Sequence, residues 1–174
     1  MEELVDEGLA KNIGVSNMAG ALLNDLHSYA RIEPQVLQIE LHPYLTQDNM
    51  VHYAKNVLGM AITGYSSFGP QSFYELGAAQ DVPSLLSHDL VTSIAQQVKK
   101  SKLEYRPTYF WLLLTKFFPI APAQVLLRWA TQRGIAVIPK SNNQARLEEN
   151  LTVTNFDLTE EQLKTISSLN RNLR

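Results

Sequence analysis

Four short apolar runs, each followed by a segment of helical character, constrain the fold of this chain more than any other feature. The runs occupy residues 12–17, 36–40, 60–65 and 135–138, and each is bounded by turn residues. Apolar strands that alternate with helices are typical of a parallel sheet with crossover helices. The pattern therefore predicts an α/β fold built from four β-α units.

The segments between the runs have the apolar spacing of helices. In the first of them, Leu22, Leu23 and Leu26 are expected to face inward. The chain also opens on residues that resemble the end of a helix, with Leu4, Val5 and Leu9 on one side and Gly8 as the stop. Helices are expected at 19–30, 49–57, 87–100, 122–133 and 145–150, with a last helix whose capping box is Thr159 and Gln162 and a polar loop at 66–84.

Polar residues follow every predicted strand at its C-terminal end. They are Ser16-Asn17, Glu40 to His42, Tyr65-Ser66 and Lys140-Ser141. A complete (β/α)₈ barrel needs about 250 residues and builds its active site at this end of its strands. Four units therefore predict half of such a barrel, with a functional site at these polar strand ends.

Composition excludes several classes of function. The chain has 174 residues, a net charge of −2 and no cysteine. A near-neutral protein lacks the basic surface that nucleic acids or anionic membranes require. The absence of cysteine excludes a disulfide framework and a thiolate site. The apolar run 109–120 contains Lys116 and Pro119 and is shorter than the roughly 20 residues of a membrane span. We expect a cytoplasmic protein without nucleic-acid or membrane partners.

Several segments stand in a characteristic order along almost the whole chain: 14–17, 38–45, 64–69, 125–129, 138–142 with Arg146, 149–150 and 156–159. In this order and spacing they resemble the aldo-keto reductases. The resemblance implies that the chain is the C-terminal half of a (β/α)₈ TIM barrel, a single partial domain over residues 1–174 that holds the cofactor. Residues 69–73 are similar to fungal xylose reductases in particular.

Side chains at the first three strand ends suit a nicotinamide ring. Ser16, Asn17 and Gln38 offer hydroxyl and amide groups that can bond a carboxamide. Tyr65 offers a flat ring for stacking. Turn and capping chemistry is the alternative explanation for Ser16 and Asn17, and core packing is the alternative for Tyr65.

A polar loop after the fourth strand suits a phosphate. Arginine binds phosphate with two hydrogen bonds and lysine acts as a point charge, although such residues are commonly solvated surface. The resemblance assigns Lys140, Ser141, Asn142 and Arg146 to the adenosine 2′-phosphate of NADP(H), and Glu149 and Asn150 to the adenine. The resemblance also implies that Glu75 stands where xylose reductases that accept NAD(H) carry an acidic residue near the ribose hydroxyls, which extends the expectation to NAD(H). The cofactor-binding residues implied are Ser16, Asn17, Gln38, Tyr65, Ser66, Ser67, Phe68, Gln71, Ser72, Glu75, Lys140, Ser141, Asn142, Arg146, Glu149 and Asn150.

No catalytic residue is assigned in this chain. The family uses a Tyr, a Lys, an Asp and a His, and the resemblance places all four in the first half of the barrel. His42 is expected to be structural, and His27, His52 and His88 lack the spacing of metal ligands. The chain has no G-x-G-x-x-G loop, which argues against a Rossmann fold.

Two segments depart from the family pattern. The start at Met1 matches an internal part of family sequences, so it is expected to be an internal or mispredicted start. Residues 102–121 have neither helical nor alternating periodicity, and joining Ser101 to Pro122 restores the family pattern. A retained intron translated in frame is one hypothesis, and a genuine insertion that forms a hydrophobic surface hairpin or a partner site is the other.

Two functions remain open on the sequence. The first is an oxidoreductase that uses NAD(P)H to reduce an aldehyde or an aldose such as xylose, with this chain carrying the cofactor-binding half and inactive alone. The second is a non-catalytic nucleotide-binding remnant or interaction module. Half a barrel also leaves open strand edges, so we expect a homodimer or aggregation through them.

Overall fold

The sheet of this protein has four strands that run parallel and follow one another in chain order. The computed structural model describes residues 1–69, 82–104 and 120–173, without the side chains of 99–104. Strands β1 (Gly14–Ser16), β2 (Val36–Glu40), β3 (Ala61–Tyr65) and β4 (Ala136–Val137) form the order β1-β2-β3-β4. All three pairings are parallel. The predicted α/β class is confirmed, and the winding is consistent with part of a (β/α)₈ barrel.

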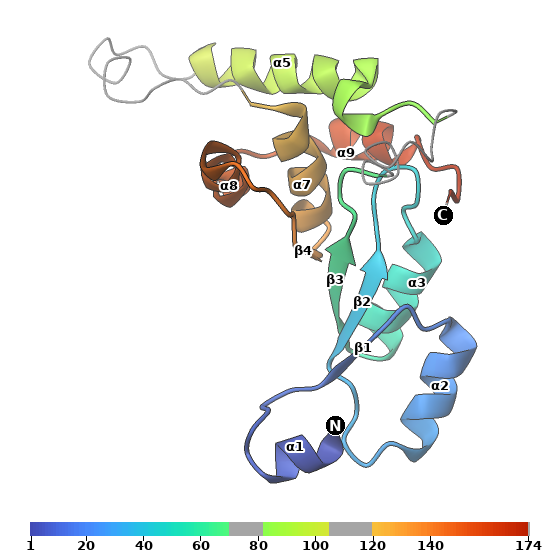
Figure 1. The fold of residues 1–174 in the computed structure, drawn as a ribbon. Coiled ribbons are helices and arrows are strands. Elements are labelled where there is room, and N and C mark those ends of the chain that lie inside the picture. Colours follow the sequence, from blue (N-terminus) through green and yellow to red (C-terminus); the bar gives the residue numbers. More distant parts are fainter. Residues whose placement is uncertain (70–81, 105–119, 174) are drawn as a thin grey trace.

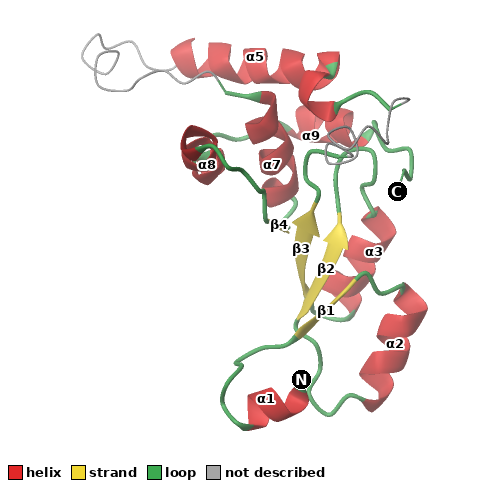
Figure 2. Ribbon diagram, in the orientation of Figure 1, coloured by secondary structure: helices red, strands yellow, loops and turns green. Residues whose placement is uncertain are grey.

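Helices connect the strands and lie around them (Figures 1 and 2). Helix α5 lies at the end of the molecule toward which β2 and β3 point (Figure 1). Helix α3 continues directly as a π-helical segment, and two short 3₁₀ segments occur at Leu85–Ser87 and Val153–Asn155. The helices are α1 (Glu2–Asp6), α2 (Gly20–Tyr29), α3 (Asp48–His52) with its π segment Tyr53–Val57, α5 (Asp89–Glu104), α7 (Pro122–Gln132), α8 (Gln144–Leu151) and α9 (Glu160–Ser167).

The two faces of the sheet differ in burial. Successive strand residues point to opposite faces. On one face, Leu37, Ile39 and Ile62 are nearly inaccessible and join a core that includes Leu23 of α2 and Trp129 of α7. The other face is half-buried or exposed, and we call it the open face. It carries Gly14, Ser16, Val36, Gln38, Glu40, Ala61, Thr63, Tyr65 and Ala136.

Most predicted element positions are confirmed, and the misses are local. Strand β2 has the predicted bounds, whereas β4 is two residues instead of four because it pairs only along Thr63 and Gly64 of β3. Helix α5 extends to Glu104, so the start of the segment 102–121 is helical. The remainder of that segment, 105–119, lies outside the described residues.

The predicted inward faces of the first two helices were partly wrong. Leu23 is fully buried, but Leu22 is 55% exposed. Adjacent helical positions are about 100° apart, and in α2 the side that packs against the core carries Leu23 while Leu22 points away from it. Leu9 is 73% exposed because α1 has already ended. The predicted stop is confirmed, since Gly8 has φ +71° just after the helix.

The C-terminal helix begins with the predicted capping box. Gln162 N–H donates to Thr159 Oγ1 at 3.1 Å, and Thr159 N–H donates to Gln162 Oε1 at 2.9 Å. The reciprocal bonds satisfy two backbone donors that a helix start otherwise leaves free. This local signal therefore sets where α9 starts.

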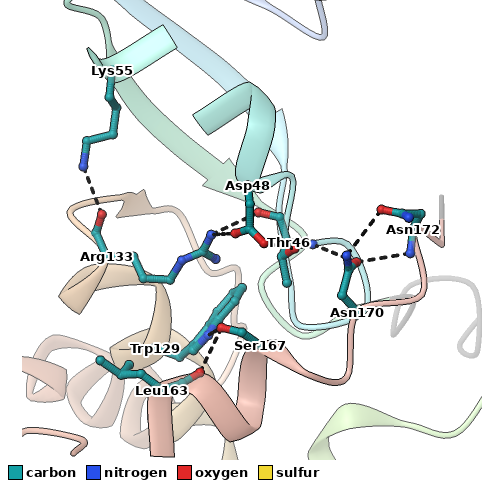
Figure 3. A network of polar contacts seen from close by, with 9 residues as sticks. All are labelled: Thr46, Asp48, Lys55, Trp129, Arg133, Leu163, Ser167, Asn170 and Asn172. Carbon is teal, nitrogen blue, oxygen red and sulfur yellow. Dashed lines mark hydrogen bonds and ion pairs between the residues drawn. The ribbon is translucent and has the colours of Figure 1, made fainter. Parts of the chain in front are cut away.

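A polar network fastens α7 and the C-terminal segment to the start of α3 (Figure 3). Trp129 Nε1–H donates to Ser167 Oγ at 2.9 Å. Arg133 donates to Asp48 at 2.5 Å, and Thr46 N–H donates to Asn170 Oδ1 at 3.3 Å. Burial lowers the pKa of Arg133, and the nearby carboxylate of Asp48 partly offsets that effect. The network therefore holds α7 and the C-terminal segment against the start of α3.

Among the helices of residues 1–69, 82–104 and 120–173, none has the length and hydropathy of a membrane-spanning segment.

Candidate functional site

The C-terminal ends of β1, β2 and β3 bring four of the predicted site residues together. Ser16 and Gln38 are register partners on neighbouring strands. Asn17 N–H donates to the carbonyl oxygen of Gln38 at 2.9 Å. The Tyr65 hydroxyl donates to Asn17 Oδ1 at 2.9 Å, across the width of β2. These four residues therefore lie next to one another near the strand ends and form the first cluster of the site.

Left-handed backbone conformations turn the chain at two of these strand ends. Asn17 has φ +56° and Ser66 has φ +54°. This region is uncommon for residues other than glycine, and asparagine tolerates it better than most. The strands therefore stop at once, and the following residues lie at the rim of the sheet rather than along it.

The cluster has the donors and acceptors of a carboxamide site beside an aromatic ring. The bond from Tyr65 assigns Asn17 Oδ1 as an acceptor, so the amide nitrogen of Asn17 is its donor group. Asn17 and Ser16 are exposed, whereas Gln38 and Tyr65 are half-buried. A planar ligand with an amide substituent can stack on Tyr65 while its amide bonds to these polar groups.

Glu40 belongs to the same face and was not assigned a role from the sequence. It is the register partner of Tyr65, and its carboxylate lies 3.3 Å from His42 Nε2. His42 is only 2% exposed, in keeping with the structural role expected for it. The signal in the sequence was the alternation of Gln38 and Glu40 along one strand.

The second predicted group follows β4, the strand next to β3. Asn143 caps α8, because its Oδ1 accepts from Arg146 N–H at 3.2 Å. Ser141 Oγ accepts from Asn143 N–H at 3.1 Å and shapes the loop before the helix. Lys140, Asn142 and Arg146 are exposed there. Two cationic side chains thus flank a helix start, where backbone N–H groups favour an anion.

Gln124 positions this second group and was missed in the sequence. It is 6% exposed on α7, and its Nε2 donates to the Glu149 carbonyl oxygen at 2.9 Å and to Thr152 Oγ1 at 3.0 Å. Both acceptors lie at the C-terminal end of α8. The only hint was a polar residue among the apolar positions of the segment 122–133. Glu149 and Asn150, predicted for the adenine, are half-buried.

The loop after β3 holds the remaining predicted residues. Ser66 is exposed, and Phe68 packs against the core. Ser67 is buried, and its hydroxyl has no hydrogen-bond partner among the residues that the structure describes. Gln71, Ser72 and Glu75 lie outside the described residues.

A comparison with known protein families identifies the chain. The model of the "Aldo/keto reductase family" matches residues 1–171, almost the whole sequence. The chain belongs to the aldo/keto reductase family. The resemblance found in the sequence is therefore confirmed, and the polar cluster lies at the strand ends where a barrel of this kind builds its site.

Curated relatives within the family are fungal xylose reductases. The chain is 53% identical to a probable NAD(P)H-dependent D-xylose reductase xyl1 of Neosartorya fischeri, over 100% of the chain and 48% of that protein. It is 52% identical to the NAD(P)H-dependent D-xylose reductase xyl1 of Aspergillus niger, over 100% of the chain and 49% of that protein. The chain thus spans about half the length of the curated relatives it matches.

Proposed function

We propose that this aldo/keto reductase chain carries the cofactor-binding part of an NAD(P)H-dependent reductase. The reaction is reduction of an aldehyde, or of an open-chain aldose such as xylose, to the alcohol. The observation that carries the proposal is the contact between Tyr65 and Asn17, which places a flat ring beside amide groups on the open face. The names of the fungal relatives support the cofactor and the substrate class.

In this proposal the first cluster binds the nicotinamide end of the cofactor. The ring of Tyr65 stacks on nicotinamide, and Ser16, Asn17 and Gln38 bond its carboxamide. The bound cofactor supplies the hydride for the carbonyl carbon of the substrate. The chain's own residues orient the ring, and the hydrogen bond from Tyr65 to Asn17 holds two of them in fixed relation.

The second group binds the adenosine end. Lys140, Ser141, Asn142 and Arg146 hold the 2′-phosphate of NADP(H), and Glu149 and Asn150 contact the adenine. The exposed cationic side chains beside the start of α8 support this assignment. We assign Ser66, Ser67, Phe68, Gln71, Ser72 and Glu75 to the same cofactor, with Glu75 binding ribose hydroxyls and thereby admitting NAD(H).

We expect the 174-residue chain alone to bind the cofactor without turnover, because no catalytic residue is assigned within it. Isothermal titration calorimetry with NADPH tests binding, and NADPH oxidation in the presence of D-xylose tests turnover. Binding without oxidation is the expected result. Failure to bind NADPH would contradict the proposed site. Xylose-dependent oxidation would show that the chain itself supplies a proton donor.

An interaction module without catalysis is the second candidate function. The open face supports it, and so does the edge of β1 that no strand of the described residues covers, because exposed strand edges pair with other chains. We propose homodimerisation or aggregation through these edges in a cytoplasmic protein. Sedimentation equilibrium decides the oligomeric state, and a monomer over a wide range of concentrations would contradict the dimer.

We also propose that residues 102–121 are an insertion into the family domain. The position supports this, since the segment begins in the last residues of α5 and ends just before α7. Sequencing the mature transcript across Ser101 and Pro122 decides between the two origins. A transcript that lacks the codons for these residues identifies a retained intron, and a transcript that keeps them identifies a genuine insertion.

A further inference from the structure

A carboxylate lies directly beside the aromatic ring of the proposed cofactor site. Glu40 and Tyr65 are register partners on β2 and β3. Neighbouring strands are about 4.8 Å apart, and paired residues of parallel strands project from the same face. Glu40 therefore shares the open face with Tyr65, and it is two positions along the same strand from Gln38.

The structure holds Glu40 in place rather than leaving it free in solvent. Its side chain is 22% exposed, and Oε1 lies 3.3 Å from Nε2 of the buried His42. The Gln47 side-chain amide donates to the backbone carbonyl oxygen of Glu40 at 2.5 Å. Among the described residues, no lysine or arginine forms an ion pair with Glu40. The carboxylate of Glu40 is thus held in one position. Within this part of the chain, no lysine or arginine side chain neutralises it.

A fixed carboxylate interacts differently with the two redox forms of a nicotinamide ring. The oxidised ring carries a positive charge, whereas the reduced ring is neutral. A ring stacked on Tyr65 would lie next to the strand position of Glu40, within the range where unit charges interact measurably. Attraction to the carboxylate would therefore be present for the oxidised form and absent for the reduced form.

We infer that Glu40 tunes the redox balance of the bound cofactor by stabilising the oxidised nicotinamide relative to the reduced one. The inference rests on the proposed function, because it requires the nicotinamide to stack on Tyr65. Preferential binding of the oxidised form makes the bound reduced cofactor a stronger hydride donor. His42 acts as the positioning residue that keeps the carboxylate on the open face.

Equilibrium binding to the full chain tests this without any turnover. Calorimetric Kd values are measured for NADP⁺, NADPH and adenosine 2′,5′-bisphosphate, which lacks the nicotinamide. Glu40→Gln should weaken NADP⁺ about fivefold, the effect of a unit charge pair about 4 Å apart in water. The Kd values of NADPH and of adenosine 2′,5′-bisphosphate should change by less than about twofold, the ordinary scatter of a neutral surface change.

Two further variants isolate the charge. Glu40→Asp keeps the carboxylate and should retain most of the preference for NADP⁺. Glu161→Gln removes an exposed carboxylate from α9 and should leave all three Kd values unchanged. Equal weakening of NADP⁺ and NADPH by Glu40→Gln would overturn the inference and leave the proposed function intact. A chain that binds neither nicotinamide cofactor would overturn both.

Salt dependence gives an independent measurement if Glu40→Gln does not fold. The ratio of the NADP⁺ and NADPH Kd values cancels the phosphates, which both cofactors share. In the unsubstituted chain, the Kd of NADP⁺ divided by the Kd of NADPH should increase when the NaCl concentration is raised from about 0.02 M to about 0.5 M. The reason is that salt screens partly exposed charges. A ratio that does not change with salt would overturn the role of Glu40.

Discussion

The hydroxyl of Tyr65 donates a hydrogen bond of 2.9 Å to Oδ1 of Asn17 and thereby joins the ends of β3 and β1 over β2. The two residues are separated by 48 positions in the sequence. Asn17 itself donates through its backbone N–H to Gln38 on β2. Hydrogen bonds therefore connect three strand ends at the site where we propose that nicotinamide binds.

Removing the ring of Tyr65 should weaken the nicotinamide end of the cofactor. Aromatic stacking contributes about 0.5–1.5 kcal/mol beyond burial, so Tyr65→Ala should raise the Kd of NADPH about two- to tenfold. Tyr65→Phe keeps the ring, loses only the bond to Asn17 and should have the smaller effect. Calorimetry measures both Kd values. If both variants raise the Kd of NADPH by the same factor, the site uses the hydroxyl of Tyr65 and not its ring.

Arg146→Ala should weaken NADPH much more than NADH. Hydrogen bonds to charged groups contribute about 1.5–3 kcal/mol, which corresponds to about a 10- to 150-fold rise in the Kd of NADPH. NADH lacks the 2′-phosphate, so its Kd should stay within about twofold. Lys164→Ala on α9 is the matched control, because Lys164 is also exposed and cationic. Equal losses of NADPH and NADH affinity would place Arg146 elsewhere in the site.

Gln124→Ala should destabilise the chain and loosen α8. The substitution removes the two bonds to Glu149 and Thr152 and leaves their acceptors without this donor. Loss of a buried partner costs about 1–3 kcal/mol in the free energy of unfolding. Urea denaturation followed by circular dichroism measures the change. Gln96→Ala on α5 is the control, since Gln96 is exposed and should change stability by less than about 0.5 kcal/mol.

Ser167→Ala should also lower stability, through the indole that it leaves unpartnered. Trp129 is 1% exposed and donates to Ser167 Oγ at 2.9 Å. An unsatisfied buried donor costs about 1–3 kcal/mol in the free energy of unfolding. The same denaturation experiment applies, with the exposed Ser93→Ala on α5 as control. A change as small as that of the control would mean that water replaces the serine as acceptor.

Local signals in the sequence were sufficient for the element order and for the polar residues at the strand ends. Strand bounds at 36–40 follow from an apolar run between turns, and the start of α9 follows from Thr159 and Gln162 alone. The polar residues after each strand were also recognisable, because parallel strands present their C-terminal ends at one edge. Asn17 and Tyr65 stand at two of these strand ends, and their side chains are hydrogen-bonded to each other.

Other features depend on neighbours that lie far away in the sequence. Leu22 and Leu23 are both leucines in one helix, and only packing against the sheet buries the second while the first stays 55% exposed. In the sequence, Gln124 is a polar residue among apolar ones. Its role follows only from the fold, which places the acceptors Glu149 and Thr152 beside it. Burial and hydrogen-bond satisfaction are properties of the packed molecule, because the partner groups come from other elements.

The sequence by itself determined the family, the alternation of strands and helices, and the residue types at each strand end, since these depend on local composition and order. Only the tertiary structure decided which face of the sheet stays open and which side chains meet on it. The pairing of Glu40 with Tyr65 is set by strand register, and a shift of one residue would move Glu40 to the covered face. Register results from the packing of Leu37, Ile39 and Ile62 into the core, because that packing requires the alternate residues of β2 and β3 to point to the opposite side.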